Sequence, residues 1–250
     1  MLTFRDSLSD AKLPMSVAPG QTIGLGLELR AAIDPCTCAR VLVVGDIARR
    51  VLEDVHSAQV LAAVITDDHA AADQLLRSGL MVRPVIGVYA TRAAAEAGVG
   101  RPLSLITTPA EVQHELPVWP QVVAVAPVRA PGRCPESEAA TVRLALACVD
   151  YAQPLEVTRS VLERCQAILE RWRDRMDQWS RHASRPIPPT SRAAAIAALD
   201  DDLNVARVVA MMSELEDIEG IEPGAKLEAF NYLDRVLAVD LTRDLGRKGR

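Results

Sequence analysis

The chain has 250 residues, of which 49% are hydrophobic and 24% are charged, and its net charge at pH 7 is −5. This composition is typical of a soluble globular protein with one large domain or two modest ones. The acidic balance excludes a surface that binds nucleic acid all over, but it does not exclude a local basic face. No apolar run is long enough for a transmembrane helix, and the charged N-terminus "MLTFRDSLSD" does not fit a signal peptide. We therefore expect a cytoplasmic protein without membrane contact.

Apolar runs alternate with alanine-rich amphipathic stretches in the first half of the chain. Five apolar runs are predicted to be strands: 40–46, 59–68, 83–90, 102–108 and 120–128. Three stretches are predicted to be helices, the last with Thr91 as its N-cap: 47–58, 70–80 and 91–99. Strands that alternate with helices of about ten residues are typical of a parallel sheet flanked by helices. Residues 1–133 are therefore predicted to form a Rossmann-like α/β domain.

The pattern changes after the Pro- and Gly-rich segment "RAPGRCPES" (129–137). Apolar residues now recur only at helical spacing, most clearly along the long stretch 155–184. Four helical stretches are predicted to supply four or five antiparallel helices: 136–152, 155–184, 191–218 and 224–241. Residues 134–250 are therefore predicted to form an all-α helical bundle.

Polar residues at predicted strand ends form the first candidate site. Ligands of open parallel sheets bind beyond the carboxyl ends of the strands, where we place Asp46 and the run Thr66-Asp67-Asp68. The same residue types are favoured as helix N-caps, and we favour that second interpretation. "GLGLELR" (24–30) contains G-x-G but no third glycine, so it is poor evidence for a phosphate loop.

Two cysteines one residue apart stand in "DPCTCAR" (34–40). A structural zinc site needs four ligands, and the other Cys and His residues are scattered singly. A redox pair would favour C-x-x-C over C-x-C. We therefore interpret Cys36 and Cys38 as small residues packed at a strand entrance and predict no metal. Cys148 and Cys165 are interpreted as core residues, and no disulfide framework is expected.

Several segments of the chain resemble cysteinyl-tRNA synthetases, in the order and spacing of that family. They are "LTFRDSLSDAKLPMSVAPGQ" (2–21), "ARVLVVGDIARRVLEDV" (39–55), "VITDD" (64–68), "EAATVRLALACVDYAQPLEVTRSVLERCQAILERW" (138–172) and "ALDDDLNVARVVAMMSEL" (198–215). "AILERWRDRM" (167–176) is also similar to the cysteine ligase of mycothiol synthesis. The resemblance implies the Rossmann-like core of class I synthetases, of the HUP type, followed by a helical domain.

The resemblance also implies that the catalytic motifs are degenerate. Pro35, Cys36, Thr37 and Cys38 stand where the family has its His-Ile-Gly-His signature, whose histidines stabilise charge on the ATP phosphates. A neutral thiol is a weak donor, and Pro35 has no backbone N–H. The stretch aligned with the first zinc ligand, 24–34, contains neither Cys nor His. "VRAPGRCPES" (128–137) stands in place of the Lys-Met-Ser-Lys-Ser loop, and the anticodon-reading region is expected to be absent.

No cofactor is therefore expected: the zinc would be lost, and ATP would bind weakly if at all. The residues that would line the vestigial nucleotide cleft are Cys36, Thr37, Cys38, Asp46, Thr66 and Asp67.

Arginines of the long helical stretch form a second candidate site. In the family this domain lies along the tRNA, so the resemblance implies phosphate contacts by Arg171, Arg173, Arg175 and Arg181. Interleaved acidic residues favour instead a solvated face with local ion pairs. We favour that second interpretation slightly.

These observations predict a degenerate, reduced paralogue of cysteinyl-tRNA synthetase that acts by binding. Its partner would be tRNA, a synthetase or a pathway enzyme. One alternative is an adenylate-forming cysteine or aminoacyl ligase whose rebuilt site uses Cys36 or Cys38. Another is a structural interaction module or a homodimer.

Overall fold

The computed structural model describes residues 2–7, 11–15, 18–109, 121–130 and 138–246. Its centre is a sheet of five parallel strands in the order β5-β4-β3-β6-β7. The strands are β3 (Thr22–Leu29), β4 (Gln59–Thr66), β5 (Val88–Tyr89), β6 (Leu103–Thr107) and β7 (Val122–Ala124). Four of them lie within predicted strands, and the predicted α/β class is confirmed. The central strand β3 was not among the predicted strands.

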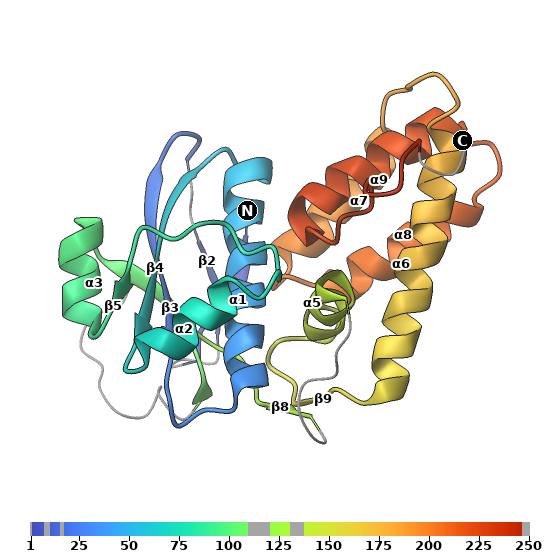
Figure 1. The fold of residues 1–250 in the computed structure, drawn as a ribbon. Helices are drawn as coiled ribbons and strands as arrows, with labels where there is room; N and C mark the ends of the chain where they lie inside the picture. The colour runs from blue at the N-terminus through green and yellow to red at the C-terminus, as the bar shows by residue number, and fades with distance from the viewer. Residues whose placement is uncertain (1, 8–10, 16–17, 110–120, 131–137, 247–250) are drawn as a thin grey trace.

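Different helices cover the two faces of the sheet (Figure 1). Successive buried side chains of β4 belong alternately to two apolar clusters, with the period of two that a strand imposes. Val64 faces the larger core, which includes α1 (Pro35–Arg50) and α2 (His69–Leu76). Ile65 faces a smaller apolar cluster under α3 (Arg92–Val99). The Rossmann-like unit is thus a three-layer sandwich.

The second half of the described chain is helical, as predicted, and lies on the far side of α1 from the sheet (Figure 1). Its helices are α5 (Ala139–Ala147), α6 (Arg159–Trp179), α7 (Pro189–Asp200), α8 (Val205–Asp217) and α9 (Pro223–Leu237). The predicted boundary at 133/134 falls outside the described residues, so the division into two domains stays a prediction. None of the helices in the described ranges combines the length and apolar character needed to cross a bilayer.

Two small sheets complete the fold. Their strands are β1 (Thr3–Arg5) and β2 (Lys12–Pro14), which are antiparallel, and β8 (Val128–Arg129) and β9 (Leu155–Glu156), which are parallel. The N-terminal hairpin β1-β2 is bound by the segment that follows α7. The hydroxyl of Thr3 donates to the carbonyl of Asp200 at 2.8 Å, and the amide of Arg5 donates to the carboxylate of Asp202 at 2.9 Å. Residues nearly 200 positions apart therefore meet at this hairpin.

The predicted strand 40–46 is wrong, because these residues lie inside α1. The helix begins at Asp34, which caps it, and Pro35 occupies its first turn. It continues into the π-helical turn η1 (Val51–Val55), so the predicted separate helix 47–58 is the end of the same element. All of 41–44 is buried, because α1 packs on the sheet on one side and on α5 and α9 on the other. A helix buried all round shows no amphipathic period.

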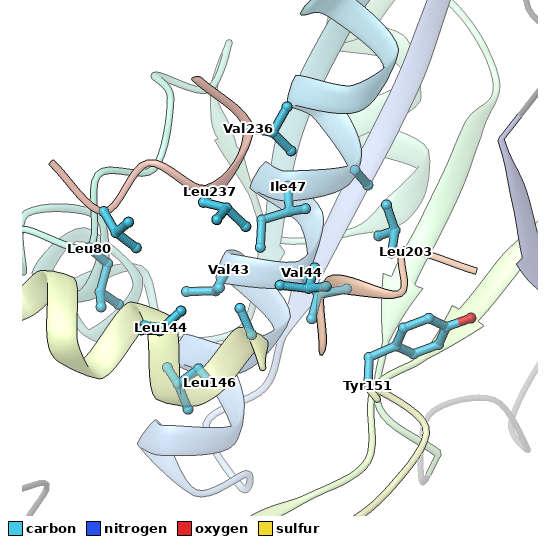
Figure 2. Close-up of a cluster of buried hydrophobic side chains, with 14 of the residues drawn as sticks. Val43, Val44, Ile47, Leu80, Leu144, Leu146, Tyr151, Leu203, Val236 and Leu237 are labelled. Atoms are coloured by element: carbon cyan, nitrogen blue, oxygen red, sulfur yellow. The ribbon is translucent and has the colours of Figure 1, made fainter. Parts of the chain in front are cut away.

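A continuous apolar seam joins α1 to the helical half (Figure 2). Val43, Val44 and Ile47 of α1 belong to this buried cluster. Leu144 of α5 and Leu237 of α9 complete it from the other side. Because one core includes residues from both halves, the sheet and the helices stabilise each other.

Arg40 crosses this seam and forms no ion pair with a carboxylate among the described residues. Its guanidinium is fully buried and donates to five backbone carbonyls at 2.7–3.3 Å. The acceptors are Ala126, Leu146, Val149, Asp150 and Gln153. Carbonyls beyond the last turn of a helix have no partner within it, so Arg40 satisfies the end of α5. Burial lowers the pKa of Arg40 to about 10, which still leaves it charged at neutral pH.

Candidate functional site

A cleft of about 770 Å³ opens beyond the carboxyl ends of β3 and β4, between the first turn of α1 and helix α2. This is the edge at which parallel sheets bind ligands. Cys36, Cys38 and Thr66 of the predicted set line it. The remaining walls are mostly apolar, with Leu29, Ile33 and Leu75 among them, and with carboxylates at Asp34 and Asp68.

The first turn of α1 is closed by its own cap. One carboxylate oxygen of Asp34 accepts from the amide of Cys36 at 2.8 Å and from that of Thr37 at 3.4 Å. Pro35 offers no N–H. A helix N-terminus normally attracts anions through free amides and a positive dipole end. Here a carboxylate already occupies those amides, so a phosphate would meet negative charge.

Both cysteines lie in this first turn and not at a strand entrance, which corrects the predicted location. Both are buried, as predicted. The thiol of Cys38 faces the carbonyl of Arg30 at 3.8 Å, and burial raises the pKa of Cys38 above its usual value. The Cys38 thiol is therefore neutral near pH 7, whereas a nucleophilic cysteine needs its thiolate form.

Thr37 belongs to the same turn, but its side chain points into the protein interior and not into the cleft. Its hydroxyl accepts from the amide of Val128 at 2.9 Å and is buried. The side chain therefore fixes β8 against the start of α1. It is not among the residues that line the cleft.

The polar run after β4 holds backbone in place. The hydroxyl of Thr66 accepts from the amide of Asp68 at 3.0 Å, and Asp68 caps α2 by accepting from Ala71 at 3.0 Å. Asp67 accepts from the amide of Ala31 at 2.7 Å, which ties the end of β4 to the loop after β3. The capping interpretation is confirmed for Asp68.

Asp46 is far from the carboxyl edge and lies inside a helix, which corrects both its place in the predicted cleft and its interpretation as an N-cap. It lies in the middle of α1, where its carboxylate accepts from Arg143 and from Arg50, both at 2.6 Å. Arg143 is fully buried and also donates to the carbonyls of Leu80 and Leu237. Asp46 therefore anchors α1 to α5 and α9.

A buried carboxylate that the sequence interpretation missed lies beside the cleft. Glu28, at the end of β3, is fully buried and accepts from Arg92 at 2.7 Å, from Thr107 at 2.9 Å and from Arg30 at 2.5 Å. Burial opposes its ionisation, but Arg92, Thr107 and Arg30 outweigh that effect and lower the pKa of Glu28. The signal in the sequence was a charged pair, Glu28 and Arg30, at the end of the apolar stretch 24–30.

The residues of this edge do not fit a zinc ion. Over the described parts of the chain, no three His, Cys, Asp or Glu side chains converge in a way that could hold a metal. Gly26 and Leu27 stand in the middle of β3, where the resemblance would require the first thiolate ligand. A closed zinc site needs four ligands and a catalytic one three, so we derive no zinc-dependent step.

The predicted basic face is largely neutralised. Arg173 is buried and pairs with Glu138 at 2.8 Å, so its assignment to a phosphate-binding surface is wrong. The other three arginines are half-exposed or exposed and form ion pairs: Arg171 and Arg175 with Glu216, and Arg181 with Asp177. Glu216 comes from α8, so the pairing reaches beyond local spacing.

Comparison with known proteins gives a partial likeness. No protein-family model matches the chain. Over 112 residues, 44% of its length, the chain is 36% identical to the cysteine–tRNA ligase of Methylocella silvestris. The matched stretch spans 21% of that relative, so the likeness covers about a fifth of the longer protein.

Proposed function

We propose that the chain is a catalytically degenerate relative of cysteinyl-tRNA synthetases that acts by binding and does not activate cysteine. The partial likeness to a cysteine–tRNA ligase supports the relationship. The observation that carries the proposal is the closed first turn of α1, where Asp34 occupies the amides of Cys36 and Thr37.

The electrostatics of this turn oppose adenylate chemistry. Attack on the α-phosphorus of ATP needs fixed donors or cations where negative charge develops. The turn offers a carboxylate, a proline and the neutral thiol of Cys38. ATP would have to displace Asp34 from its cap and bring a triphosphate beside it.

The cleft itself suits a different class of small molecule. Its walls are mainly apolar, and the carboxylates of Asp34 and Asp68 line it. Arg30 lines it too, but its guanidinium pairs with the carboxylate of Glu28 at 2.5 Å. This combination favours an uncharged or cationic ligand over a nucleotide triphosphate. For the macromolecular partner, the ion pairs of Arg171, Arg175 and Arg181 support a protein, such as a synthetase or a pathway enzyme, over tRNA.

Cysteine-dependent exchange between ATP and pyrophosphate tests the central point. We expect no exchange above background from protein freed of host synthetase, with an active cysteinyl-tRNA synthetase as positive control. Robust exchange that tracks the purified chain would overturn the proposal.

The variant Asp34→Ala tests whether the Asp34 cap is what opposes ATP binding. The substitution frees two amides and removes a negative charge, so we expect a larger ATP-induced rise in melting temperature than in the unaltered protein. The lost cap should cost about 1 kcal/mol of unfolding free energy. The matched variant Asp68→Ala removes the other cap that lines the cleft. Its ATP-induced rise in melting temperature should be smaller than that of Asp34→Ala. An ATP response in the Asp34→Ala variant no larger than in the unaltered protein would contradict the argument.

A further inference from the structure

A second cavity, of about 280 Å³, lies between α7, α8 and α9 in the helical half. It shares no lining residue with the cleft at the sheet edge. Its walls are largely apolar side chains from three different helices, among them Ala195, Met211, Leu215, Ala229 and Leu233. Ile218, one of the few large apolar residues exposed in the described structure, is at its edge. Concave apolar walls with a few polar groups are characteristic of small-molecule sites.

Two polar groups converge on this cavity from α7 and α9. The guanidinium of Arg192 lies over the ring of Tyr232, 5.1 Å from its centroid. Among the described residues, no carboxylate lies within ion-pair distance of Arg192. The hydroxyl of Tyr232 is buried and has no hydrogen-bond partner there. Buried hydroxyls are almost always paired, so this one calls for an acceptor.

The charge of the cavity favours an anion. Arg207 and Glu214 also line it, but they pair with each other at 2.9 Å and cancel. Arg192 is left as the net charge, beside an unsatisfied hydroxyl donor. A carboxylate accepts from a guanidinium through two oxygens and is the acceptor that arginine matches best.

We propose that this cavity binds a small aliphatic monocarboxylate. The carboxylate would accept from Arg192 and from the hydroxyl of Tyr232, and the alkyl chain would lie against Met211, Leu215 and Leu233. A volume of 280 Å³ holds about nine non-hydrogen atoms, at the ~30 Å³ that a water molecule takes up. A chain of roughly six carbons fits this limit. The inference is independent of the function proposed for the cleft.

Calorimetry with hexanoate on the full chain tests the site, with 1-hexanol as the uncharged probe of the same chain length. We expect saturable binding of hexanoate and at least tenfold weaker binding of hexanol, because the alcohol forms no ion pair with Arg192. Equal affinity for the two probes, or no saturable binding of hexanoate, would overturn the proposal.

Variants locate the site. Arg192→Met keeps a long side chain and removes the charge, and it should weaken hexanoate binding about tenfold while leaving hexanol unchanged. Arg159→Met makes the same change at a highly exposed position on α6 and should have no effect. Ala194→Leu places bulk at an exposed wall position and should abolish binding of both probes. Hexanoate binding that survives both Arg192→Met and Ala194→Leu would place the ligand elsewhere and refute the assignment.

Discussion

Glu28 stabilises the carboxyl edge of the sheet, beside the cleft. Its buried carboxylate holds Arg92, Arg30 and Thr107 together from three segments of the chain. Removing one partner of a buried ion pair costs about 3–5 kcal/mol, because the other charge is left uncompensated. We expect Glu28→Gln to lower the free energy of unfolding by about 3 kcal/mol at pH 7, measured by urea denaturation. The exposed control Glu163→Gln should change it by less than about 0.5 kcal/mol.

The same carboxylate predicts a pH dependence. The pKa of Glu28 is lower in the folded protein than in the unfolded chain, where it is about 4.3. Its contribution to stability is therefore complete above that value and is lost as the pH falls through the folded-state pKa. The difference in unfolding free energy between the unaltered protein and Glu28→Gln should shrink as the pH drops below about 4. A difference that stays constant into strong acid would contradict this assignment.

Cys148 is predicted to be the reactive thiol among the four described cysteines. A hydrogen bond from Cys165, helped by the charges of Arg40 and Arg164, outweighs the effect of burial and lowers the pKa of Cys148. Burial raises that of Cys38. Iodoacetamide at pH 7 should modify Cys148 faster than Cys38, as read by peptide mass spectrometry, because the thiolate is the form that reacts. Faster modification of Cys38 would instead support the alternative of an enzyme with rebuilt chemistry.

At the scale of elements, local sequence signals predicted β4, α2 and α3 correctly but failed for the buried helix α1. The strand at 59–66, the helices α2 and α3 and the cap at Thr91 could be predicted because alternation, amphipathic spacing and capping are local. The buried run 41–44 has no period, and its β-branched residues favour a strand. Asp34 and Pro35 were the signals that marked a helix start. The burial of Arg173 could not be predicted, because its partners lie far away in sequence.

The contact between α1 and β3 gives a prediction at this scale. A Cβ at Gly45 would overlap the side chain of Leu27, which is fully buried and has little room to move. Alanine gains about 1 kcal/mol of helix propensity, but overpacking a core costs about 1–3 kcal/mol. We expect Gly45→Ala to lower the melting temperature. The exposed control Ala197→Gly on α7 should lower the free energy of unfolding by only the difference in helix propensity, about 1 kcal/mol. A Gly45→Ala protein more stable than the original would show that α1 can shift away from the sheet.

At the scale of the molecule, the shared core predicts cooperative unfolding. Apolar residues of both halves form one cluster, and Arg40 and Arg143 bridge the halves with hydrogen bonds. We expect far-ultraviolet dichroism and tryptophan fluorescence, to which Trp172 and Trp179 contribute, to report one coincident transition in urea. Arg40→Met should shift that whole transition by about 3 kcal/mol or more, because five backbone carbonyls, two of them in fully buried hydrogen bonds, lose their donor. Two separated transitions would instead support independently folding domains.

The docking of the N-terminal hairpin on residues 200–202 sets an order of events during synthesis. Thr3 and Arg5 leave the ribosome before their partners Asp200 and Asp202, which emerge nearly 200 residues later. At about 5–20 residues per second, that interval is roughly ten to forty seconds. During that interval the hairpin cannot form its contact with residues 200–202. Strand β1 of the nascent chain must therefore wait for this contact until α7 and the segment after it have been made.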